Sequence, residues 1–105
     1  MKTLMILFIS VIGYFLPNPS INQVQLSGTA NQNVLSFSIE NQGSTTQTLN
    51  YTVTQDDLVL LRNGTTTLLT GMIENIELSA STGTHDYTLT VSLSTGGNKS
   101  FSLTY

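Results

Sequence analysis

His85 and Asp86 are the residues of this chain whose types come closest to a catalytic arrangement. A serine nucleophile activated by histidine and an acid would need His85 as its base, because the chain has a single histidine. The two residues are neighbours at the start of an expected strand, so their side chains should point apart. No Gly-x-Ser-x-Gly motif accompanies them. The pattern favours a solvated turn histidine over a catalytic one.

Carboxylates offer two further candidates. Glu74 and Glu77 are candidates for glycoside hydrolysis, which needs two opposed carboxyl groups, but the pattern around them gives no clear inward direction. Asp56, Asp57 and Asp86 are the plausible donors for calcium, yet they lack the Asp-x-Asp-x-Asp-Gly spacing of a dedicated loop. The sequence therefore predicts solvated turn acids, no metal, no cofactor and a protein that is not an enzyme.

Composition excludes several functional classes. The 105 residues suffice for one domain, and only 9% of them are charged. Three basic residues leave no electrostatic surface for nucleic acid. The absence of cysteine removes thiol catalysis and thiolate metal sites, and it requires an exported core to hold without disulfides. The net charge of -3 favours no class of charged partner.

Residues 1–16 have the features of an export signal. Lys2 precedes an apolar run that ends at a Pro-Asn-Pro-Ser segment, although no Ala-x-Ala cleavage motif is present. The run is shorter than the roughly 20 residues that a membrane-spanning helix needs. We therefore expect a signal peptide, with a short uncleaved membrane anchor as the alternative, then a linker at 17–20 and a domain at 21–105. The expected location is extracellular or at the cell surface.

From Ile21 onward, apolar and polar side chains alternate with the period of two that strands show. The pattern predicts strands at 23–26, 35–40, 49–54, 87–94 and 101–105, and two more within 58–61, 66–70 and 76–80. Turns are expected at 27–28, 41–44, 63–64, 81–83 and 96–98, where Gly, Asn and Ser gather. These features predict an all-β protein, an antiparallel β-sandwich of about seven strands, with a small closed barrel as the competitor.

The strand that begins at Tyr87 is expected to be central, because it is long and evenly alternating. A tyrosine at the start of a late strand can hydrogen-bond back to upstream backbone and fix the corner. Tyr87 is therefore a candidate tyrosine corner, and a plain core aromatic is the alternative.

The segments 37–44, 62–65, 83–91 and 94–105 share a characteristic succession of strands and turns. They resemble the immunoglobulin-like modules of prokaryotic surface proteins, including adhesion-type modules and the head domains of archaeal pilins and flagellins. The resemblance covers roughly residues 34 to 105 and implies an immunoglobulin-like sandwich in a structural or adhesive surface protein, with a pilin-like filament subunit as one form.

The chain departs from the pilin pattern at its N-terminus. Pilins resemble one another in a long apolar helix, whereas Pro17 and Pro19 end the apolar run early here. A filament built by strand exchange needs no such helix. Residues 18–26 could be the donated strand, but an ordinary first strand of the molecule's own sandwich is the favoured interpretation.

Three Asn-x-Ser/Thr sequons are candidate glycosylation sites, at Asn50, Asn63 and Asn98. Asn50 is opposite in parity to its inward neighbours on an expected strand, and the other two fall in expected turns. All three should therefore face solvent.

The sequence favours a non-enzymatic extracellular structural or adhesive surface protein, whose partners are further copies of itself or other surface proteins. A membrane-anchored envelope or virion structural protein would have the same physical features and is an alternative. Its membrane contact would come only through residues 1–16, if they are retained. A secreted ligand- or carbohydrate-binding module is the other alternative. It would need exposed aromatic rings, but those after the leader all have inward parity: Phe37, Tyr51, Tyr87, Phe101 and Tyr105.

Overall fold

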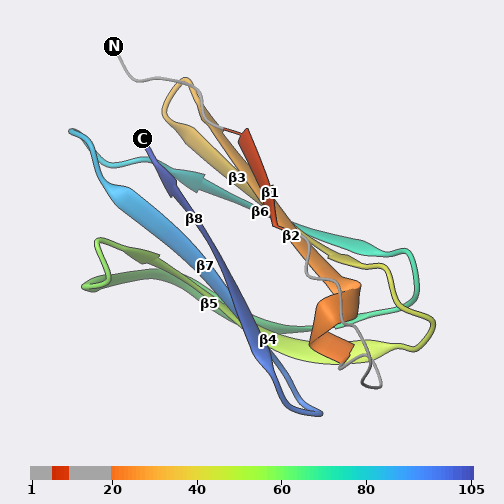
Figure 1. Cartoon of the computed structure of the whole chain (residues 1–105). Coiled ribbons are helices and arrows are strands. Elements are labelled where there is room, and N and C mark those ends of the chain that lie inside the picture. Colours follow the sequence, from red (N-terminus) through yellow and green to blue (C-terminus); the bar gives the residue numbers. More distant parts are fainter. Residues whose placement is uncertain (1–5, 10–19) are drawn as a thin grey trace.

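Two layers of antiparallel strands make up the molecule (Figure 1). The computed structural model describes residues 6–9 and 20–105. The elements are β1 (Ile6–Ile9), a 3-10 helix η1 (Ser20–Gln23), β2 (Val24–Asn31), β3 (Val34–Asn41), β4 (Gln47–Gln55), β5 (Val59–Leu68), β6 (Ile73–Ser79), β7 (Asp86–Leu93) and β8 (Asn98–Thr104). The predicted all-β sandwich is confirmed.

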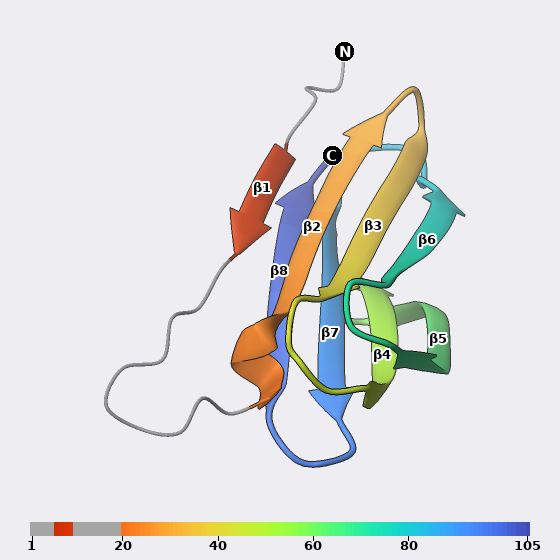
Figure 2. The same ribbon diagram turned by 90° about the vertical axis from the view of Figure 1, so that its right-hand side faces the viewer.

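One sheet has the order β1-β2-β3-β6 and the other the order β5-β4-β7-β8, and the first lies over the second (Figure 2). With β2 as strand A, the layers correspond to A-B-E and G-F-C-C′ of an immunoglobulin-like sandwich. β7 lies between β4 and β8, so the strand that contains Tyr87 is an interior strand, as the sequence predicts.

Aromatic side chains from both sheets fill the core. Tyr87, Phe37 and Phe101 are the largest of the fully buried side chains that the structure describes. The rings of Phe37 and Phe101 meet edge to face, with centroids 6.2 Å apart. Gly28 lies beside this pair, and a Cβ added there would come within 2.6 Å of the Phe101 ring and 2.8 Å of the Phe37 ring. The glycine therefore provides the space in which the two rings pack.

This packing overturns the turn expected at Ser27-Gly28. Both residues lie inside β2, and the hairpin between β2 and β3 turns at Gln32 and Asn33. Their φ angles of 51° and 64° are the pair of left-handed conformations that a two-residue type I′ turn requires. The prediction was wrong because this glycine accommodates a neighbouring ring instead of a turn.

The turn expected at Asn63-Gly64 is also wrong, for a similar reason. Both residues lie within β5, where Asn63 pairs with Thr52 and Gly64 pairs with Tyr51. A Cβ at Gly64 would lie 2.6 Å from the Tyr51 hydroxyl oxygen, so the glycine lets the tyrosine extend over it. The segments 58–61 and 66–70 consequently fall mostly in the single strand β5, and 76–80 falls mostly in β6, so the two strands expected in this region are present.

The predicted leader is described only in part. Residues 6–9 form β1, which pairs antiparallel with β2 from Leu26 to Thr29, and they are not helical. Residues 1–5 and 10–19, which hold the rest of the predicted signal peptide or anchor and most of the linker, lie outside the described residues. In the part of the chain that the structure does describe, no helix has the length and apolarity to span a membrane. Val24 to Leu26 belong to β2 of the molecule's own sandwich.

Candidate functional site

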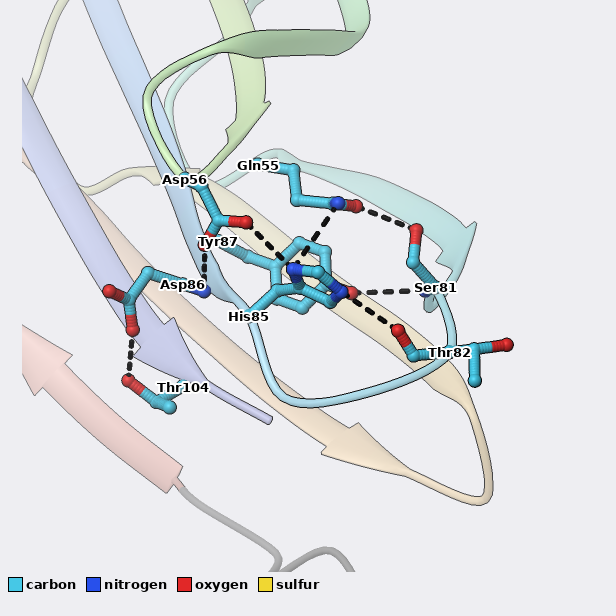
Figure 3. Close-up of polar contacts among 8 residues, drawn as sticks. All are labelled: Gln55, Asp56, Ser81, Thr82, His85, Asp86, Tyr87 and Thr104. Carbon is cyan, nitrogen blue, oxygen red and sulfur yellow. Dashed lines mark hydrogen bonds and ion pairs between the residues drawn. The ribbon is translucent and has the colours of Figure 1, made fainter.

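Asp56, His85, Asp86 and Tyr87, all singled out from the sequence, lie together at one end of the sandwich (Figure 3). The turn between β4 and β5, the loop that precedes β7 and the end of β8 meet there. The cluster consists of Gln55, Asp56, Ser81, Thr82, His85, Asp86, Tyr87 and Thr104.

His85 is held from two sides. Its Nδ1 lies 2.7 Å from Oδ2 of Asp56, and its Nε2 lies 2.8 Å from the carbonyl oxygen of Thr82. Both ring nitrogens therefore face acceptor oxygens, a carboxylate on one side and a backbone carbonyl on the other. The Gln55 amide nitrogen is farther from Nδ1, at 3.4 Å. The ring is thus engaged on both sides by groups of the protein itself.

The expectation of a solvated turn histidine is therefore wrong. The His85 side chain is 25% exposed and joins two loops that are far apart in the sequence. The expectation that His85 and Asp86 point apart is confirmed, because Asp86 turns to β8, where its Oδ1 accepts a hydrogen bond from the Thr104 hydroxyl at 2.6 Å.

Asp56 connects the β4–β5 turn to the start of β7. Its Oδ1 accepts the backbone N–H of Asp86 at 2.9 Å, and its own N–H donates to the Asp86 carbonyl at 2.7 Å. Asp56 and Asp57 have φ angles of 54° and 57°, a left-handed conformation that Asp tolerates better than most residues. The Asp86 hydrogen bond, then the hydrogen bond and charge of His85, hold the pKa of Asp56 below its ordinary value of 3.8.

This lowered pKa predicts a specific loss of stability in acid. A carboxylate whose pKa is lower in the folded state stabilises the fold above its unfolded-state pKa, and this stabilisation disappears as the pH falls through the folded-state value. We expect wild type to exceed Asp56→Asn in urea midpoint at about pH 5, and this difference to shrink progressively as the pH falls below about 4. Asp57→Asn in the same turn controls for the removal of one negative charge. A difference that is equal at both ends of the pH range would contradict the prediction.

Tyr87 makes the kind of backbone contact that a tyrosine corner makes. Its ring is buried, and its hydroxyl oxygen accepts the N–H of Ser81, six residues upstream, at 3.0 Å. Ser81 also donates from its hydroxyl to Oε1 of Gln55 at 2.7 Å. The ring of His85 stands edge to face against Tyr87 with centroids 6.3 Å apart. Tyr87 thus links the core to the loop that carries His85.

The other carboxylates do not converge. Glu74 lies opposite the buried Ile39, and its carboxylate accepts the Thr66 hydroxyl at 2.9 Å. Glu77 is exposed and lies opposite Ser36, on the other face of the sheet. Among residues 6–9 and 20–105, no group of three His, Cys, Asp or Glu side chains is placed to hold a metal ion.

The described surface has open hollows at several places. One of about 380 Å³ is lined by Asn33 and residues 80–83, and so includes Ser81 and Thr82 of the cluster. Another of about 300 Å³ is lined by residues 50–52 and 63–65 of β4 and β5, and a third of about 250 Å³ by Val34 and residues 77–79. His85 lines none of these three.

The three sequon asparagines, Asn50, Asn63 and Asn98, are exposed. Asn50 lies on β4 as expected, whereas Asn63 lies within β5 and Asn98 begins β8. The first two sequons lie side by side on antiparallel strands, with Asn50 opposite Thr65 and Thr52 opposite Asn63. The Thr65 hydroxyl donates to Oδ1 of Asn50 at 2.6 Å. Glycosylation at these positions stays a prediction.

Three buried polar residues, Asn41, Gln47 and Lys99, were not found from the sequence. Lys99 points inward from β8 with 8% of its surface exposed, and its ammonium donates to the carbonyl oxygen of Val24. Burial lowers the pKa of this lysine. Asn41 is fully buried at the end of β3. The signal for Lys99 was its parity with Phe101, which marks an inward position.

Comparisons of the chain with protein-family models, with curated proteins and with solved structures find no match.

Proposed function

We propose that this chain is a non-enzymatic extracellular structural or adhesive surface protein built as one immunoglobulin-like module. The observation that carries the proposal is the structural role of His85, whose ring nitrogens both contact other parts of the chain. The chain's single histidine, the residue best suited to acid–base chemistry, contacts Asp56 and Thr82 through its two ring nitrogens and joins two loops. The cluster around it supports the fold.

The outer face of the β5-β4-β7-β8 sheet supports the same proposal. Its outward positions are almost all neutral hydroxyl or amide side chains: Thr48, Asn50, Thr52, Thr54, Asn63, Thr65, Thr67, Thr88, Thr90, Ser92, Asn98, Ser100, Ser102 and Thr104. Several of them bond to each other across strands, such as Thr48 with Thr67 at 3.0 Å and Thr88 with Ser102 at 2.9 Å. Such a face is hydrated without charge, which suits a protein exposed outside the cell.

The carbohydrate-binding alternative has no comparable support. Stacking on sugar rings needs exposed aromatic faces, but four of the five aromatic side chains described are buried and Tyr51 is half-buried. The partners of the proposed protein are accordingly further copies or other surface proteins, which would meet strand edges or its polar face.

Protease treatment of intact cells that produce the protein tests the proposal. An external protein is expected to be degraded from outside while a cytoplasmic marker stays intact, and immunogold labelling should place it at the surface or on filaments. Retention inside protected cells would contradict the proposal.

A further inference from the structure

The strands at the margins of the sandwich are not equally protected against pairing with other chains. β5 carries Arg62, β6 carries Glu74 and Glu77, and β8 carries Lys99. Charged side chains on edge strands oppose pairing with another chain. β2, with eight residues from Val24 to Asn31, contains neither a charged residue nor a proline. Sequence alone gives β2 no such protection.

β2 is instead covered by other parts of the chain. β1 pairs with it from Leu26 to Thr29 and lies alongside it at the margin of the sheet (Figure 2). Beyond the end of β1, the Lys99 ammonium binds the Val24 carbonyl. Because backbone groups of alternate residues point to the same side of a strand, Val24, Leu26 and Gly28 share this edge. Among residues 6–9 and 20–105, the strand that pairs with the middle of this edge is therefore β1, residues 6–9, which fall within the predicted leader.

We propose that removal of residues 1–16 during export exposes this edge, and that β2 of a second copy then pairs with it in antiparallel orientation. The sheet then continues through both molecules, and β1 acts in the precursor as a temporary cover that prevents early association. This inference rests on the proposed function, because it requires export and cleavage.

A second copy fits the exposed edge for two reasons. Cleavage creates the same edge on every copy, and a two-fold contact satisfies both edges at once. Pairing centred on Ser27 places Leu26 opposite Gly28 of the second copy and Gln25 opposite Thr29. The outward side chains of Gln25, Ser27 and Thr29 are neutral, so no like charges meet across the axis. Two single strands form a small interface, so the dimer is expected to be weak and to depend on concentration.

The experiment uses the full chain expressed with secretion, and the mass of the secreted product gives its first residue. Sedimentation velocity over a concentration series should then show a monomer–dimer equilibrium. Ser27→Lys places two lysines opposite each other across the axis and is expected to weaken the dimer about tenfold or more. Ser36→Lys adds the same charge to the same sheet face, but on the interior strand β3, and should leave the dimer intact.

The outcomes separate this inference from the proposed function. A protein that stays inside the cell contradicts the proposed function. A secreted and cleaved protein that is monomeric at every concentration overturns only the dimer, and so does a dimer that Ser27→Lys leaves unchanged. Secretion with residues 1–16 intact also overturns the inference, because β1 would still cover the edge. Slower hydrogen exchange at Leu26 and Gly28 with rising concentration would support it.

Discussion

Replacing Phe101 with alanine is expected to lower the free energy of unfolding by about 3–5 kcal/mol. The residue is 1% exposed, and its ring packs edge to face against Phe37 of the other sheet, in the core between the two sheets. Its removal forfeits the burial of a large side chain and leaves a cavity that neighbouring strands cannot fill without shifting. Urea denaturation followed by tyrosine fluorescence or circular dichroism measures the loss, and Leu103→Ala is the matched truncation on the same strand.

A double-mutant cycle with Gly28 tests the cause. In wild type, Gly28→Ala is expected to destabilise by about 1–3 kcal/mol, because its Cβ would come within 2.6 Å of the Phe101 ring. In the Phe101→Ala background the Phe101 contact is gone, the Phe37 ring at 2.8 Å gains a cavity into which it can shift, and alanine relieves the intrinsic cost of glycine in a strand. The penalty should therefore shrink by at least about 1 kcal/mol. An unchanged penalty would show that Gly28 is needed for another reason.

The period-two pattern predicted the inward positions well, because burial of alternate residues depends only on strand geometry. The core residues Leu35, Phe37 and Ile39 were assigned in this way, and all are fully buried. Glycine was ambiguous. Gly28 and Gly64 looked like turns, but each makes room for an aromatic ring whose approach depends on the pairing of distant strands. Local sequence does not contain that information.

The candidate site shows the same limit. The residue types around His85 were visible, and so was the separation between its side chain and that of Asp86. Its partner Asp56 is 29 positions away, and only the packing of two loops brings them together. Lys99 and Asn41 were missed because a polar residue at an inward position is explained by its hydrogen-bond partner, which a single sequence does not name.

Asn41→Ala is expected to lower the free energy of unfolding by about 2–5 kcal/mol. The Asn41 amide nitrogen donates to the carbonyl oxygens of Thr45 and Leu68, both at 2.9 Å, and its Oδ1 accepts the N–H of Gly43 at 3.0 Å. Truncation leaves these backbone groups without their partner, and each buried group left unsatisfied costs about 1–3 kcal/mol. Chemical denaturation measures the total, and hydrogen exchange should show early opening at residues 42–46 and at the end of β5.

Asn41→Leu separates lost hydrogen bonds from lost volume. Leucine has a similar size but cannot donate to Leu68 or accept from Gly43, so it should destabilise about as much as alanine does. Gln42→Ala, at the exposed neighbouring position, should change stability by less than about 0.5 kcal/mol. If leucine restored wild-type stability, packing alone would account for Asn41, and the link between the end of β3, its following loop and β5 would not depend on the amide.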